Sequence, residues 1–488
     1  MAGIGFELKK LFRRKGLFAT LRAYGYAGVI TTGPMLLSVV LLLGMMFLCR
    51  LYGTPEQDQT VLICMITYTL LSSMMVTGFF SMAVTRYLAD MLFLNQQKAI
   101  MPSFWGSNTI MLAVGCVLYG GFLLFSGAGV FQCILCYILF GAMIVNWNSM
   151  SYLTAIKDYK GIMYSFLAAV AASFISGWLL LCLGVPVIEG LLGAVNVGYG
   201  VMLVWDISLL YGYFPRDSRN KETPFAYLKW VDRFWELTLT GFFINLGMFA
   251  HIVIIWFSKI GVRVKGLFYG APYYDVPALM AFLTIMMTTV NFVVSVEVNF
   301  FEKYRNYYAL YNDKGSYRDI KKAENEMLTV MWSELWYTAV KQVLVTLLAV
   351  AFGSILLNRL PLGFNDLMHG YFRVLCIGYG FYAIGNTIVQ ILMYFTDYEG
   401  SLMAAASFAG TSFVLTAVLT RYNTAFYGFG FLLGSALYFL VALFRLNYFT
   451  RRLPYFLLCR QPIVSEDKRG MFTRLGLFLD QKFEEKEK

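Results

Sequence analysis

Long apolar segments with few charged residues alternate with shorter polar ones along the whole chain. A helix needs roughly 20 residues to cross a bilayer, and each apolar segment is close to that length. The pattern therefore predicts an all-α membrane protein with about twelve transmembrane helices. The predicted spans are residues 23–49, 60–85, 104–125, 130–156, 161–184, 188–214, 236–257, 276–301, 335–357, 371–396, 400–420 and 426–446.

A polar connection divides the twelve spans into six and six. Because six spans return the chain to its starting side, the two halves have the same orientation, and any repeat between them is parallel. Weak matches support two pseudo-symmetric six-helix bundles, such as Thr77 with Thr289 and Asn146 with Asn386, although chance remains an alternative. The predicted parts are an amphipathic helix at 1–22, the first bundle at 23–214, an interfacial linker at 215–235, the second bundle at 236–446 and a tail at 447–488.

The first 22 residues combine basic and apolar positions at helical spacing. Lys9, Lys10, Arg13 and Arg14 lie opposite apolar residues, which is typical of a helix on an anionic membrane surface. A cleavable signal peptide is the alternative. Its apolar region would be about half as long as 23–49 and would end in a small-residue cleavage site, so a first transmembrane helix is the preferred interpretation.

The basic excess has an uneven distribution along the chain. Lys and Arg number 39 against 28 Asp and Glu, a net charge of +11, which by itself could indicate nucleic acid. With the N-terminus in the cytoplasm, however, 31 of the basic residues fall in cytoplasmic segments and 7 in outer ones, when Arg373 and Arg445 near the ends of their spans are counted with the adjoining segments. The positive-inside rule then places both termini in the cytoplasm, and the basic residues face anionic lipid rather than nucleic acid.

Several chemistries lack their sequence signals. There is no P-loop for ATP, the two histidines are far apart, and no Cys/His cluster has metal-ligand spacing. Seven of the eight cysteines fall in apolar spans, so their positions do not indicate a disulfide framework. We expect no cofactor, no metal and no enzyme activity, although a few membrane-embedded acids or a histidine could suffice for catalysis.

Polar residues in the spans form two stripes. At 100° per residue, one face of the eighth span and one face of the tenth each carry a row of hydroxyl, amide and phenol groups. Such rows line a substrate path or bond neighbouring helices to one another. The residues predicted for the path are Thr288, Asn291, Ser295 and Asn299 on the eighth span and Tyr379, Tyr382, Asn386 and Gln390 on the tenth. Lys341, in the ninth span, is expected to snorkel or to pair with Glu297.

A predicted cytoplasmic segment at 302–334 is rich in tyrosine and ends in an amphipathic helix. It either rests on the membrane interface or docks a partner protein. The predicted docking residues are Tyr304, Tyr307, Tyr308 and Met327.

Two blocks of sequence resemble a known family. The opening MAGIGFELKKLFRR, followed by YGYAGVITTGP, and the block YRNYYALYNDKGSYRDIKKAENEM at 304–327 are similar to the PelG family. That family is the inner-membrane component of the Pel exopolysaccharide export machinery. The chain departs from it at Thr32 and Met35, where Ser and Trp would be expected beside Gly33 and Pro34.

The resemblance implies a transporter of the multidrug/oligosaccharidyl-lipid/polysaccharide flippase superfamily in the bacterial cytoplasmic membrane. It implies export of a nascent, uncharged hexosamine polymer, a cytosolic glycosyltransferase partner and other inner-membrane subunits, one of them a cyclic di-GMP receptor. The residues by themselves indicate a transporter with a long polar path. A flippase for a polyprenyl-pyrophosphate-linked sugar or another small solute, and a membrane-embedded acyl- or glycosyltransferase, are the alternatives.

Overall fold

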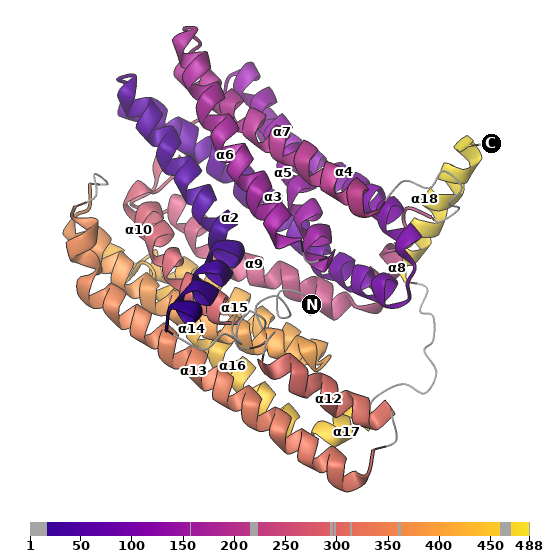
Figure 1. The fold of residues 1–488 in the computed structure, drawn as a ribbon. Coiled ribbons are helices and arrows are strands. Elements are labelled where there is room, and N and C mark those ends of the chain that lie inside the picture. The colour runs from indigo at the N-terminus through magenta and orange to yellow at the C-terminus, as the bar shows by residue number, and fades with distance from the viewer. Residues whose placement is uncertain are drawn as a thin grey trace. The chain divides into compact units, whose positions relative to one another are not determined.

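The computed structural model describes residues 17–156, 158–214, 223–292, 296, 299–312, 315–359, 363–458 and 470–487. Within them, eleven helices are long and apolar enough to cross a membrane, and the first helix, α2 (Leu17–Leu51), contains a shorter apolar stretch at Leu36–Leu51 (Figure 1). The prediction of about twelve transmembrane helices is confirmed.

The chain forms two compact units. Unit 1 comprises Met1–Gly33, Ala250–Ile260 and Ala271–Val464, and unit 2 comprises Pro34–Phe249, Gly261–Gly270 and Ser465–Lys488. Helix α9 (Trp235–Trp256) contributes to both.

Unit 2 is built around α3 (Glu56–Phe93), α5 (Val130–Ile156) and α7 (Val187–Tyr213), which pack on one another, with α4 (Ile100–Phe125) against α3 and α5, and α6 (Tyr159–Cys182) against α7. The short turn η1 (Gln97–Ala99) leads into α4. Small residues permit close approach, because a side chain at Gly198 of α7 would come within 1.9 Å of Ser173 Oγ on α6.

A small hairpin also belongs to unit 2. Strands β1 (Val262–Lys265) and β2 (Phe268–Gly270) pair antiparallel. The N–H of Leu267 donates to the Ser126 carbonyl at 2.8 Å, and Lys265 Nζ donates to Gln132 Oε1 at 2.9 Å. These bonds explain why residues 261–270 belong to unit 2 although they follow α9 in the sequence.

The chain's last described helix docks on the polar connection after α7. Helix α18 (Met471–Glu487) packs on α8 (Leu228–Arg233). The Asp232 carboxylate accepts hydrogen bonds from the backbone N–H of Phe472, at 3.3 Å, and of Thr473, at 2.6 Å. Asp232 thus caps the N-terminus of a helix 240 residues further along the chain.

Unit 1 contains α10 (Pro272–Phe282), η2 (Leu283–Ile285), α11 (Met286–Phe292), α12 (Phe301–Asn312), α13 (Tyr317–Leu357), α14 (Asp366–Tyr394), α15 (Tyr398–Leu419), η4 (Thr424–Phe426), α16 (Phe429–Arg451) and α17 (Leu453–Leu458). Helix α14 lies at its centre and contacts α10, α11, α13, α15 and α16. The predicted ninth span and the amphipathic segment before it form one continuous helix, α13.

The eighth span is not the unbroken α-helix that the sequence pattern predicts. A 3₁₀ turn at Leu283–Ile285 separates α10 from α11, and Pro277 lies inside α10. The Thr284 hydroxyl donates to the Ala281 carbonyl at 2.7 Å, a local bond of the kind that competes with regular helix pairing. The 100° spacing assumed for the stripe therefore does not hold across the turn.

The last three spans of each half share one arrangement. Helix α7 packs on α5 and α6, and α16 packs on α14 and α15 (Figure 1). The turn before the middle helix is also the same, since Asp158 accepts from the Gly161 N–H at 2.9 Å and Asp397 from the Gly400 N–H at 3.3 Å. This likeness agrees with two pseudo-symmetric bundles.

Candidate functional site

A polar cluster joins α11 to α13 in unit 1. The buried Thr288 hydroxyl donates to Gln342 Oε1, and Gln342 Nε2 donates to Thr346 Oγ1 at 3.3 Å. The buried Asn291 amide donates to Thr338 Oγ1. Two residues predicted for the substrate path, Thr288 and Asn291, are thus brought together, and in this conformation their polar groups are satisfied by α13.

Lys341 belongs to this cluster. Its Nζ donates to Asn291 Oδ1 at 2.6 Å, so the cation contacts the polar stripe itself. The expected alternative partner, Glu297, lies outside the described residues. The hydrogen-bonding row Thr338, Gln342 and Thr346 on α13 was missed from the sequence, although its spacing of four residues in an apolar helix is a readable signal.

The remaining predicted residues of the eighth span are placed differently. Asn299 is exposed, and its amide donates to Glu334 Oε1 at 2.7 Å, near the end of the membrane-spanning part of α13. Ser295 lies outside the described residues. Asn299 is therefore not brought into the cluster around Asn291.

The predicted tyrosines of α14 lie in a buried aromatic cluster. The Tyr379 ring is 4.7 Å from Phe431, and the Tyr382 ring stacks on Tyr438 at 6.1 Å between centroids. His251 packs on Phe431 at 4.3 Å, and its Nδ1 shares a 2.7 Å hydrogen bond with the Tyr274 hydroxyl, so a structural role accounts for it.

Asn386 and Gln390 are half-buried on the same face of α14, one turn apart. Asn386 Oδ1 accepts a 3.4 Å hydrogen bond from the Tyr438 hydroxyl. Asn386 therefore lies beside the aromatic cluster, and α14 also contacts α11 and α13.

The predicted docking residues need a correction. Tyr307 and Met327 are both fully buried, where α12 packs on α13. Burial also raises the pKa of the Tyr307 phenol. Tyr304 is half-buried, donates to the Tyr394 carbonyl at 2.9 Å and stacks on the half-buried Tyr308 at 4.4 Å. Tyr304 and Tyr307 thus hold α12 in place, whereas Tyr317 at the start of α13 is exposed. The other exposed side chains of this segment include the acidic Glu302 and Asp319 and the basic or amide side chains of Arg305, Asn306, Arg318, Lys321, Lys322 and Asn325.

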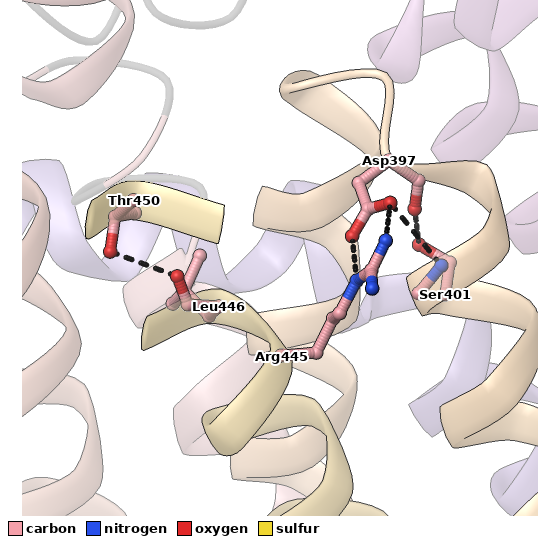
Figure 2. A network of polar contacts seen from close by, with 6 residues as sticks. Asp397, Ser401, Arg445, Leu446 and Thr450 are labelled. Carbon is pink, nitrogen blue, oxygen red and sulfur yellow. Dashed lines mark hydrogen bonds and ion pairs between the residues drawn. The ribbon is translucent and has the colours of Figure 1, made fainter. Parts of the chain in front are cut away.

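A buried ion pair in unit 1 was also missed from the sequence. Arg445 on α16 donates two hydrogen bonds to the Asp397 carboxylate, from Nε to Oδ2 at 2.6 Å and from Nη2 to Oδ1 at 2.7 Å (Figure 2). The Ser401 hydroxyl donates to the Asp397 carbonyl at 2.9 Å. Asp397 caps the N-terminus of α15. The repeated motif Asp-Tyr-x-Gly, at 158–161 and 397–400, is the signal that could have found this turn.

Metal-binding groups are absent from the described part of the chain, where no three His, Cys, Asp or Glu side chains lie close enough to hold an ion. The polar cluster offers hydroxyl, amide and ammonium groups.

The fold is that of a membrane transporter. The structure is similar to an outward-facing multidrug resistance MATE family transporter of the MOP superfamily, with a TM-score of 0.61, 14% identity and coverage of 88% of this chain and 96% of that one. It is also similar to a MOP superfamily transporter from Pyrococcus furiosus (TM-score 0.57, 14% identity, 88% and 96% covered) and to a eukaryotic MATE transporter (0.57, 11%, 94% and 99%).

The family model for PelG, described as a putative exopolysaccharide exporter, matches residues 1–457. The chain belongs to the PelG family. No curated protein matches it. The predicted family and the predicted two-bundle transporter fold are both confirmed.

Proposed function

We propose that this protein moves a nascent hexosamine-rich exopolysaccharide across the bacterial cytoplasmic membrane while a cytosolic glycosyltransferase elongates it. The family match over residues 1–457 carries the proposal, because it joins exopolysaccharide export to a transporter fold. Both termini lie in the cytoplasm, as the 31 to 7 distribution of basic residues favours.

The chemistry of unit 1 supports an uncharged sugar polymer as the cargo. Sugars need hydroxyl and amide partners for their polar groups and aromatic faces for their C–H surfaces. Thr288, Asn291 and Gln342 offer the first. Tyr382 would offer the second in a conformation that separates its ring from Tyr438, on which it is stacked here. Because the cluster is internally bonded here, the passing polymer would replace existing hydrogen bonds, an exchange with a small net free-energy cost.

A flippase for a pyrophosphate-linked sugar is the second candidate, and one observation favours it. Lys341 places a cation on the polar stripe, where it bonds Asn291. A pyrophosphate would gain a charge-assisted hydrogen bond from that ammonium, whereas a neutral polymer would gain little from its charge.

The basic exposed face of α12 and the start of α13 is the surface we assign to the glycosyltransferase. Arg305, Arg318 and Lys322 are exposed there, so charge complementarity with an acidic partner surface would orient the complex. Further inner-membrane subunits, including a cyclic di-GMP receptor, complete the proposed assembly.

Reconstitution tests the function directly. Proteoliposomes holding the full chain and the glycosyltransferase receive nucleotide sugar from outside, and an external glycosidase then digests unprotected polymer. We expect long, glycosidase-resistant polymer only when the chain is present. Protection of a short lipid-linked sugar instead would support the flippase, and product formed by the chain without the glycosyltransferase would support an enzyme.

A further inference from the structure

Unit 2 buries a carboxyl group that has no partner. Asp206 on α7 has no exposed surface, and neither of its carboxyl oxygens forms a hydrogen bond within the described part of the chain. Polar groups buried in the interior are almost always paired, and an ionised carboxylate without a partner is strongly unfavourable in a low-dielectric interior. Asp206 therefore needs a neutralising ligand.

The internal repeat shows what occupies this position in the other half. At an offset of 239 residues, Asp158 corresponds to Asp397, Tyr199 to Tyr438, and Asp206 to Arg445. The same helix pairs are bonded in both halves. The Asn146 amide of α5 donates to the Tyr199 backbone carbonyl of α7 at 3.0 Å, and the Tyr438 hydroxyl of α16 donates to Asn386 Oδ1 of α14 at 3.4 Å.

The two equivalent turns carry different charged residues, since Lys157 and Lys160 of the first half correspond to Thr396 and Glu399 of the second. Their backbones agree, with φ and ψ of −87° and 65° at Asp158 and −84° and 73° at Asp397. In unit 1, Arg445 neutralises Asp397 through two hydrogen bonds. In unit 2, the corresponding position holds a second acid, Asp206, on which Asp158 acts with a like charge. The repeat thus replaces an ion pair by a pair of acids.

Described residues near this turn form hydrogen bonds with partners other than Asp206. Asp158 accepts from the Gly161 N–H and from the Tyr213 hydroxyl, and the Ser165 hydroxyl on α6 donates to the Ile162 carbonyl. Lys160, in the first turn of α6, is exposed. On the packed elements, the Tyr152 hydroxyl of α5 pairs with Ser103 at 3.0 Å, and Arg86 of α3 pairs with Asp90 at 3.2 Å.

We propose that Asp206 is a proton-binding site, which holds a proton in the buried state and exchanges it in a conformation that exposes the carboxyl group of α7. A proton needs no coordination shell, and it converts the carboxylate into a neutral donor that the Ser165 hydroxyl can accept. That the bound proton drives polymer export rests on the proposed function. The site itself does not.

Infrared spectroscopy of the purified full chain in lipid nanodiscs tests the site without any substrate. We expect the carbonyl stretch of a buried, protonated carboxylic acid at neutral pH, and its loss in Asp206→Asn. Asp158→Asn is the matched control, because asparagine also caps helices, and the band should remain. The melting temperature of Asp206→Asn should equal that of the wild type at neutral pH, since the amide resembles the protonated acid.

The same band in wild type and Asp206→Asn, or marked destabilisation of Asp206→Asn, would overturn the proposal. The proposal would also be overturned if the wild type lacked the carboxylic acid band and its melting temperature depended on sodium, because Asp206 would then bind a metal cation instead of a proton. In the reconstituted system, polymer export that responds to an imposed proton gradient in the wild type but not in Asp206→Asn would show that proton binding at Asp206 is coupled to export. If export by the wild type does not respond to the gradient, proton binding does not drive export, and the infrared result on the site is unaffected.

Discussion

Lys341 Nζ donates a 2.6 Å hydrogen bond to Asn291 Oδ1, while the amide of the same Asn291 donates to Thr338. One asparagine therefore links the cation of the ninth span to the polar stripe of the eighth. A charge placed in a membrane segment is costly unless polar groups or water solvate it, and the amide provides that solvation. The polar path is not free of charge, which is why the two candidate cargoes can be separated at this residue.

Substitution of Lys341 distinguishes a neutral polymer from a pyrophosphate-linked sugar. For a neutral polymer, Lys341→Met should reduce secretion only mildly, because the methionine fills the space and the cargo loses no charge-assisted bond. Secreted polymer is measured by lectin binding at equal protein abundance. Lys341→Arg, which keeps the charge, is the control. An inactive Lys341→Met beside an active Lys341→Arg would favour the flippase.

Gln342 tests whether the cluster serves packing or transport. Gln342→Leu leaves the Thr288 and Thr346 hydroxyls without their partner, which should lower the free energy of unfolding by about 1 to 2 kcal/mol. Thermal unfolding in detergent, followed with a thiol-reactive dye on the buried cysteines, measures the loss. Val343→Ala, at the exposed neighbouring position, is the control. A full loss of secretion with unchanged stability would contradict a purely structural role and indicate contact with the cargo.

The sequence predicts the architecture well because long apolar segments have few alternatives in a membrane. It predicts the polar contacts less well. Thr288 and Asn291 do meet polar partners, but Tyr307 and Met327 turn inward, because an amphipathic pattern identifies an apolar face and not what covers it. The 3₁₀ turn at Leu283–Ile285 depends on local pairing that periodicity does not encode.

The contacts between distant parts of the sequence could not be predicted at all. The bonds from Asp232 to residues 472 and 473 and from Leu267 to Ser126 depend on tertiary placement. In contrast, the turns at Asp158 and Asp397 carry a repeated four-residue motif and were accessible in principle, because a local motif fixes a local turn.

The cap on α18 can be removed on its own. Asp232→Ala deletes the acceptor for the Phe472 and Thr473 N–H groups and should weaken docking of α18 by about 1 kcal/mol. Limited proteolysis should then cleave the C-terminal region faster, while thermal unfolding of the spans stays unchanged. Asp232→Asn, which retains an acceptor, should behave closer to the wild type. Equal proteolysis of all three would show that the packing of α18 on α8 suffices.

The membrane orientation follows from labelling of exposed positions. Cysteine at Val262, in β1, should react with an impermeant maleimide added to spheroplasts, and cysteine at Lys322, on α13, should react only after permeabilisation. Both positions are exposed in their own units, so access depends on the side of the membrane. The reverse result would invert the proposed orientation and place the basic face of α12 and α13 away from a cytosolic glycosyltransferase.

The two amides of α14 provide the last prediction. Asn386 and Gln390 are half-buried one turn apart on α14, and Asn386 accepts a hydrogen bond from Tyr438, so we expect a passing sugar to bond these amides. Asn386→Leu combined with Gln390→Leu should stop polymer secretion at normal protein abundance, because the passing sugars would leave hydrogen-bonding groups unpaired at roughly 1 to 3 kcal/mol each. Thr387→Val is the matched control, since the Thr387 hydroxyl donates to the Ala383 carbonyl of its own helix, and it should secrete normally. Normal secretion by the double variant would move the path away from α14, and a lowered melting temperature would assign the amides to helix packing through Tyr438.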